Sequence, residues 1–299
     1  MPLNSPTHNT DGSQSAGVLY VVATPIGHME DITLRALKVL KQVDTIAAED
    51  TRHTHNLLTH YGIATPLVSY HEHNERTKTP VLTNQLAAGK SIALVTDAGT
   101  PGVSDPGYRL VAAAVERGIS VVPVPGVSAV ITALSASGLA TDAFVFVGFP
   151  AKKAGRRKEQ LQALSQETKT LIFYESPKRI LNFLSEIQLE MGDRNAVLSR
   201  EMTKLHEEFL RGRVSGIFSI LTDRPVVKGE CTLLIAGREE ANDSADNPER
   251  MHAEIASALA AGGKLSDVSR DIAQLFGVPR RTVYDLALKL KDKGYPHVQ

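Results

Sequence analysis

Short apolar runs alternate with longer mixed segments along the first half of the chain. Four runs have the length of a strand, at residues 18–22, 45–48, 92–95 and 120–124. Residues 92–95 are apolar without interruption, which is typical of a strand buried on both faces of a parallel sheet. Helices are expected between these strands, near residues 34–40, 81–88 and 108–116. This alternation predicts an α/β domain with a largely parallel sheet.

The second half repeats this style with a different sequence. Its strand-like runs lie at residues 144–149, 170–174, 196–199 and 231–236. They predict a second α/β domain, and the boundary between the two domains is placed near residues 135–142. The first domain then spans residues 18–135, and the second spans residues 136–237.

The C-terminal part is predicted to be a separate helical unit over residues 250–299. Residues 238–249, which precede it, have little to bury and are predicted to be a linker. Ser266 is the expected cap of one helix, Gly277 its end, and Pro279 the start of the next. Two short helices joined by a glycine-containing turn resemble a helix-turn-helix, which either contacts nucleic acid or packs on the rest of the protein.

The composition limits the classes of function. Of 299 residues, 42% are hydrophobic, and 33 basic side chains balance 33 acidic ones, so contact with nucleic acid needs local patches. The single Cys231 excludes an internal disulfide and a multi-cysteine metal site. No apolar run approaches the roughly 20 residues of a membrane span. Residues 1–17 are predicted to be a disordered tail rather than a signal peptide, so a soluble cytoplasmic protein is expected.

The loop after residues 92–95 is the first candidate for a ligand site. Its glycines, Gly99, Gly102 and Gly107, let the backbone approach a ligand closely, and its prolines hold the shape of the loop. Ligands of open α/β sheets gather at the carboxyl ends of the strands. A rigid connector without a ligand is the other interpretation of this pattern.

Histidines gather in two pairs, His53 with His55 and His71 with His73. Two histidines at i and i+2 on a strand share one face, so a metal site is one interpretation. A structural or RNA-facing role is the other, and no metal is included among the predicted cofactors. A Gly-Lys-Ser triplet at residues 89–91 precedes a strand instead of following one, so it is not interpreted as a phosphate-binding loop.

The chain also carries eight short motifs in a fixed order. They are ATPIG (23–27), EDTR (49–52), SYHEHNE (69–75), DAGTP (97–101), SDPGYR (104–109), ALSASGL (133–139), FYESP (173–177) and KGE (228–230). Together they resemble the 16S ribosomal RNA cytidine 2′-O-methyltransferases of the tetrapyrrole methylase-like superfamily. The resemblance implies two α/β domains of the tetrapyrrole methylase type, with the cofactor in the cleft between them, and a homodimer. It also implies methyl transfer from S-adenosyl-L-methionine to the 2′-hydroxyl of a cytidine in the decoding region of 16S rRNA.

The resemblance assigns a set of residues to the cofactor. They are Pro25, Asp97, Ala98, Gly99, Thr100, Pro101, Val103, Ser128, Ala129, Tyr174 and Thr232. The sequence departs from the family pattern at His28, Val127 and Lys178. None of these three changes removes the cofactor loop.

Catalysis and RNA binding are assigned to polar residues elsewhere. A ribose hydroxyl is a weak nucleophile, so we expect Glu49 or Asp50 to act as a base, with Arg52 as a clamp for RNA phosphate. His71 and Glu175 are further candidates for the base, and a structural ion-pair network is the alternative role for the acidic residues and Arg52. The expected RNA-binding residues are His71, Lys152, Lys153, Arg156, Arg157 and Lys158. A solvated charged loop is the other interpretation of the basic stretch.

Two other functions are considered beside RNA methylation. Methylation of a tetrapyrrole ring carbon needs neither the basic stretch nor the C-terminal helices. A DNA-binding regulator would use the C-terminal helix pair but would leave the long α/β body unexplained.

Overall fold

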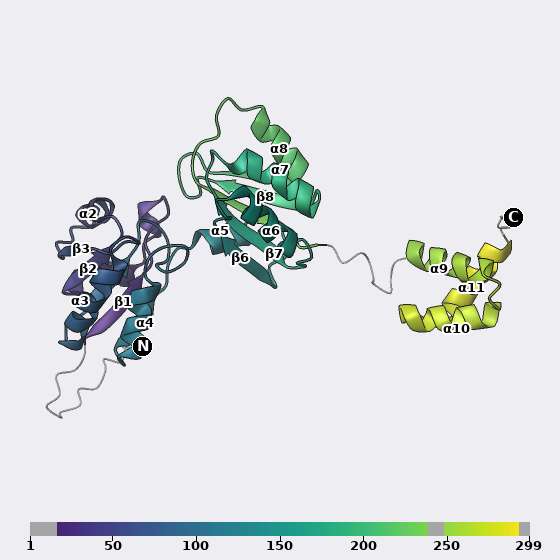
Figure 1. Ribbon diagram of the computed structural model, residues 1–299, viewed down its shortest axis with the longest axis horizontal. Helices are drawn as coiled ribbons and strands as arrows, with labels where there is room; N and C mark the ends of the chain where they lie inside the picture. The colour runs from purple at the N-terminus through teal and green to yellow at the C-terminus, as the bar shows by residue number, and fades with distance from the viewer. Residues whose placement is uncertain (1–16, 239–247, 293–299) are drawn as a thin grey trace. The chain divides into compact units, whose positions relative to one another are not determined.

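The computed structural model of the chain describes residues 17–238 and 248–292. It divides into two compact units, residues 1–237 and 238–299 (Figure 1). The predicted tail lies outside the described residues except for Gly17. The predicted linker also lies outside them, except for residue 238 and for residues 248 and 249, which begin a helix. The predicted boundary near residues 135–142 lies inside the first unit and stays a prediction.

The first sheet is parallel throughout. Its strands are β1 (Val18–Val22), β2 (Thr45–Ala48), β3 (Leu67–Ser69), β4 (Ile92–Val95) and β5 (Ser120–Val124). They lie in the order β3-β2-β4-β1-β5, and every pairing is parallel, as the alternation of strand and helix predicted. All five strands therefore end at one edge, called here the carboxyl edge.

Helices cover both faces of this sheet. They are α1 (Leu34–Gln42), α2 (Thr51–His60), α3 (Glu75–Ala87) and α4 (Tyr108–Glu116), and a 3-10 turn, Met29–Asp31, precedes α1. Successive strand residues face opposite sides. In β4, Ala93 and Val95 accordingly pack with α1 and α2, whereas Ile92 and Leu94 pack with α3 and α4. This explains why the run is apolar at every position.

The second sheet is mostly antiparallel, which the sequence pattern did not predict. Its strands are β6 (Phe144–Gly148), β7 (Thr170–Glu175), β8 (Asn195–Arg200), β9 (Glu208–Arg213) and β10 (Cys231–Ile235), in the order β6-β7-β10-β8-β9. Only β6 and β7 pair in parallel. The sequence pattern did not predict β9, because this edge strand is exposed at its charged end and has no apolar run.

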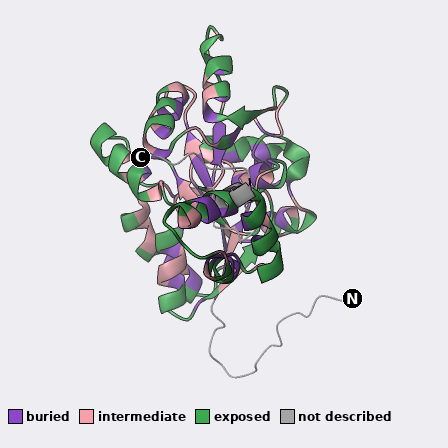
Figure 2. Cartoon of the chain, turned by 90° about the vertical axis from the view of Figure 1, so that its right-hand side faces the viewer, coloured by how far each residue is buried: buried purple, intermediate pink, exposed green. Residues whose placement is uncertain are grey.

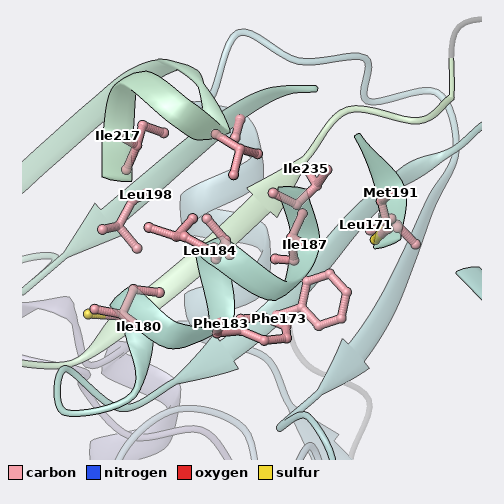
Figure 3. Packing of buried hydrophobic residues seen from close by; sticks show 14 of the residues in the cluster. Leu171, Phe173, Ile180, Phe183, Leu184, Ile187, Met191, Leu198, Ile217 and Ile235 are labelled. Atoms are coloured by element: carbon pink, nitrogen blue, oxygen red, sulfur yellow. The ribbon is translucent and has the colours of Figure 1, made fainter. Parts of the chain in front are cut away.

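Helices also cover both faces of the second sheet. They are α5 (Ala129–Ser135), α6 (Ala154–Leu164), α7 (Ile180–Met191) and α8 (Val214–Thr222). On one face α6, α7 and α8 form a core in which the rings of Phe173 and Phe183 meet edge to face at 5.2 Å (Figure 3). On the other face α5 packs together with Ile26 and Ala98 from the carboxyl edge of the first sheet. This shared cluster brings the loops of the first sheet against the second sheet. Figure 2 shows that the helices carry buried and exposed residues along their length, as expected for helices that cover a core.

The C-terminal unit has a core of its own. It contains α9 (Pro248–Ala260), α10 (Leu265–Phe276) and α11 (Arg280–Asp292), packed through residues such as Ile255, Phe276 and Val283. Gly277 ends α10 in the left-handed conformation, as predicted. The prediction that Ser266 caps α10 is wrong, because the helix already begins at Leu265 and Lys264, two residues before Ser266, occupies the cap position. Among the described residues, no helix has the length and apolar content needed to cross a membrane.

Candidate cofactor and active site

Three loops at the carboxyl edge are tied to one another. They follow β4, β1 and β5, which are neighbours in the sheet. Thr24 and Gly99 exchange backbone hydrogen bonds of 2.9 and 3.0 Å, and the Thr24 hydroxyl donates to the carbonyl of Thr96 at 3.0 Å. The Thr100 hydroxyl donates to the carbonyl of Val127 at 3.1 Å. The loops therefore form one continuous wall whose shape is set by the backbone.

Two glycines make the bend of the loop after β4 possible. Gly99 has φ of 81° and Gly107 has φ of 144°, values that side chains other than glycine rarely adopt. A Cβ atom on Gly107 would also lie 3.0 Å from Leu94 in the core. The loop thus turns back against its own strand and presents backbone to the space above the sheet.

A cavity of about 340 Å³ lies between this wall and the second sheet. Its volume is in the range of small-molecule sites. Eight of the predicted cofactor residues line it, namely Ala98, Gly99, Thr100, Val103, Ser128, Ala129, Tyr174 and Thr232. The other three, Pro25, Asp97 and Pro101, belong to the same loops but are not part of its lining.

The lining also contains residues that were not assigned to the site from the sequence. Ile26 and Asp105 come from the first half, and Phe149, Met202 and Cys231 come from the second. Asp105 belongs to the SDPGYR motif, so a signal for it was present. Phe149 and Met202 follow different strands, and only the folding of the second sheet brings them together.

Burial sets the acidity of the carboxyl groups around the cavity. It raises the pKa of Asp105 to about 7, and the charges of Glu49 and Asp97 act in the same direction. Burial also raises the pKa of Glu49, which accepts the backbone N–H of Asp97 at 3.4 Å. Both groups are therefore better suited to hold a proton near neutral pH than an ordinary carboxyl is.

Asp50 and Arg52 have a different environment. The Asp50 carboxylate accepts the backbone N–H of Arg52 at 2.8 Å and pairs with its guanidinium at 2.6 Å. These hydrogen bonds hold the pKa of Asp50 well below its usual range, so it is a poor proton acceptor. The Arg52 side chain is 89% exposed. For this pair the structure favours the ion-pair interpretation, in which Asp50 also caps α2.

Glu175 and Tyr174 bring side chains of the second sheet into the cavity. Glu175 is 4% exposed and pairs with Arg179 at 2.6 Å. Burial raises the pKa of Tyr174 to about 12, so its phenol stays neutral at physiological pH. Its ring lies 5.0 Å from Phe146 and 5.5 Å from Phe149, edge to face in both cases.

The histidines do not form a metal site among the residues that the structure describes. His53 and His55 lie on α2 and are exposed, so the idea that they share a strand face is wrong for this pair. His71 and His73 follow β3, with ring centroids 6.0 Å apart. The buried Nδ1 of His71 has no hydrogen-bond partner, and its Nε2 lies 3.1 Å from Asn74.

The predicted basic patch separates into two sets. Arg157 pairs with Glu186 at 2.6 Å and donates to the carbonyls of Ala151 and Lys152, so it holds the start of α6 in place. Lys158 lies 3.5 Å from Glu190. The other members, Lys152, Lys153 and Arg156, are exposed and form no ion pair with any residue in the described ranges.

A parallel sheet whose loops meet a mixed sheet around one cavity defines the class of protein. The Tetrapyrrole (Corrin/Porphyrin) Methylases match residues 18–217, which is more than half of the chain. The fold is also that of uroporphyrin-III C-methyltransferase from Thermus thermophilus complexed with S-adenyl homocysteine. That structure has a TM-score of 0.52 and 19% identity, over 74% of this chain and 98% of the other.

Relatives in sequence narrow the class further. Ribosomal RNA small subunit methyltransferase I of a Synechocystis species is 47% identical over 93% of this chain and 100% of the relative. The protein of the same name from Halalkalibacterium halodurans is 44% identical over 90% of this chain and 94% of the relative. The chain therefore belongs to the ribosomal RNA small subunit methyltransferase I family within the tetrapyrrole methylases. This confirms the family, the fold class and the S-adenosylmethionine-dependent methyltransferase class that the motifs predicted.

Proposed function

We propose that this protein methylates the 2′-hydroxyl of a cytidine in the decoding region of 16S rRNA, with S-adenosylmethionine as the methyl donor. The observation that carries the proposal is the 47% identity to a relative named as a ribosomal RNA methyltransferase, over that relative's whole length. The cavity and the exposed cations of the second sheet supply the physical basis. We propose the cytoplasm as the compartment, the small ribosomal subunit or its RNA as the partner, and a homodimer as the assembly.

The cavity has the chemistry that a sulfonium donor needs. Its wall of small residues, including Gly99 and Ala129, leaves room for a ligand against the backbone. Asp105, Glu175 and the ring of Tyr174 also face it, and carboxylates and aromatic faces attract a cation. S-adenosylmethionine supplies an activated methyl group, so the bound cofactor carries the difficult chemistry.

The protein then has to orient a ribose and accept its proton. We assign the base to Asp105, whose carboxyl lines the cavity and has a pKa matched to neutral pH. Glu49 keeps this pKa high through its own charge and is the second candidate. Asp50 and Arg52 stay as a positioning pair at the start of α2, where the exposed guanidinium is available to an RNA phosphate.

RNA binding is assigned to Lys152, Lys153 and Arg156, whose charges are free for phosphate. Arg157 holds the same segment in place through Glu186 and the carbonyls of Ala151 and Lys152, whereas Lys158 makes only a long contact with Glu190. His71 acts on Glu49 by lowering the pKa of that carboxyl against the larger, raising effect of burial, which suits a residue at the edge of the reaction site.

The direct test is to incubate the protein with labelled S-adenosylmethionine and, separately, 30S subunits, naked 16S rRNA and a porphyrinogen. We expect label in RNA, at a 2′-oxygen of a cytidine. Label in the porphyrinogen alone would favour tetrapyrrole methylation, which the likeness to uroporphyrin-III C-methyltransferase keeps as the second candidate.

A further inference from the structure

Phe149 is an exposed apolar residue in the lining of the cavity. It lines the cavity, and it is also 55% exposed to solvent. A large apolar ring in this position lies at the mouth of the cavity, between the interior and the surrounding water. Such exposure costs free energy unless a partner covers the ring.

The backbone holds Phe149 in a defined place. The pairing of β6 with β7 is irregular between Phe146 and Gly148, and an irregularity of this kind redirects the chain at the end of a strand. Gly148 has φ of 74°, and a Cβ atom there would lie 3.1 Å from the Ser104 hydroxyl. The residue before Phe149 is therefore fixed against the loop that follows β4.

The segment after Phe149 is held as firmly. The backbone N–H of Ala151 donates to the side-chain oxygen of Gln160 in α6 at 3.1 Å, and Arg157 donates to the carbonyl of Ala151 at 3.0 Å. The ring itself rests edge to face on Tyr174 at 5.5 Å. Phe149 is thus a preorganised aromatic surface, and ordering it on binding carries little entropic cost.

Three cations follow it closely in the chain. Lys152, Lys153 and Arg156 are exposed and free of ion pairs with described residues. An exposed aromatic ring beside free cations is the combination with which proteins hold single-stranded nucleic acid, because the ring stacks on a base while the cations bind phosphates.

We propose that Phe149 stacks on the base of the nucleotide whose ribose is methylated. The inference rests on the proposed function. A nucleotide inside an RNA helix is held by pairing and stacking, so it has to leave its stack to bring its ribose into an enclosed site. The Phe149 ring replaces the lost stacking at the mouth of the cavity and holds the sugar near Asp105.

The test compares variants at this position on the RNA substrate that the wild type methylates. Phe149→Ala is expected to raise KM for that RNA by about 10-fold or more, in line with the effect of removing one base-stacking ring. Phe149→Tyr is expected to stay within about threefold of the wild type, whereas Phe149→Leu, which keeps apolar volume without a π face, behaves like the alanine variant. The dissociation constant of S-adenosylmethionine, measured by calorimetry, stays unchanged in all three.

Phe144→Ala is the matched control. Phe144 begins β6, the strand that Phe149 follows, is 38% exposed and lies outside the cavity lining, so its removal should leave KM for RNA unchanged. The chain contains no tryptophan, so Phe149→Trp introduces a single fluorophore. Its emission should be quenched when RNA binds, because a stacked base quenches an indole ring.

Three results would overturn the inference. They are an unchanged KM for RNA with unchanged cofactor binding in Phe149→Ala, an unchanged KM for RNA with weaker cofactor binding in that variant, which would make the ring part of the cofactor wall, and full activity in Phe149→Leu. If the wild type methylates no RNA at all, the proposed function fails instead, so the two failures are distinguishable.

Discussion

The two sheets contribute to one cavity in different ways. The parallel sheet contributes backbone and small residues, such as Gly99 and Ala129, because all of its strands end at the same edge. The mostly antiparallel sheet contributes large side chains, such as Phe149 and Tyr174, because both strand ends and strand beginnings meet the cavity there. Under the proposed function, the loops of the first sheet supply the backbone wall for the cofactor and the acid–base group, whereas the second sheet supplies Tyr174 and Glu175 to the cofactor and Phe149 to the substrate.

The strongest test of this division is Asp105→Asn. Loss of the base is expected to lower kcat by about 100-fold or more, with little change in the affinity for RNA. In the wild type the rate should rise as the pH passes through about 7, where Asp105 ionises, and this rise should be absent in the variant. Single-turnover methylation across this pH range measures both effects. A variant with an unaltered pH profile would move the base to Glu49.

The same variant should also differ from the wild type in its free energy of unfolding. The pKa of Asp105 is raised from 3.8 to about 7 in the folded state, so between these pH values the folded chain binds the extra proton. The free energy of unfolding of the wild type therefore falls as the pH rises through this range. Relative to the wild type, Asp105→Asn should gain stability over the same range, by about 1 kcal/mol after allowance for partial exposure. Urea unfolding at pH 4.5 and pH 8 tests the sign.

On α6, which covers the second sheet, Arg157→Ala tests whether this member of the basic patch stabilises the fold and does not bind RNA. Only 15% of this side chain is exposed, and its removal leaves Glu186 and two carbonyls without their donor. We expect a loss of about 1–3 kcal/mol in the free energy of unfolding, seen as a lower Tm. Lys158→Ala is the control, because this lysine is 59% exposed and its contact with Glu190 is long. Equal stability of the two variants would contradict the assignment.

A change in the backbone wall should weaken cofactor binding in addition to lowering stability. Gly99→Ala forces a side chain into φ of 81°, at a cost of about 1–2 kcal/mol, and should weaken S-adenosylmethionine binding about tenfold. Gly118→Ala imposes the same kind of strain in a turn with free space around it, away from the cavity. It should lower Tm and leave the calorimetric affinity as it is. Weaker cofactor binding in both variants would show a general effect of stability.

The smallest effect is expected for the double variant Lys152→Ala with Lys153→Ala. Each lost phosphate contact lowers RNA affinity a few-fold and reduces its dependence on salt concentration. Binding measured at several salt concentrations should therefore give a shallower slope for the variant. An unchanged slope would identify these lysines as an ordinary solvated surface.

Most strands were predictable because burial on both faces requires continuous apolar runs. The runs at β1, β2, β4 and β5 agree with the observed bounds, whereas β9 had no such run. The sharp bend of the loop after β4 was predictable for a related reason, since a backbone that turns at Gly99 and Gly107 needs glycine at fixed positions. The eight motifs added the family, which the relatives confirm.

The sequence by itself determined the local elements, the sharp loop after β4 and the family, because these depend on short-range patterns and on residue type. Only the tertiary structure decided which polar groups are free and which are already paired. It joined Asp50 to Arg52, tied Arg157 to Glu186, buried Asp105 and placed Phe149 at the mouth of the cavity. Ionisation and exposure depend on neighbours that are distant in the chain, and no local pattern encodes those neighbours.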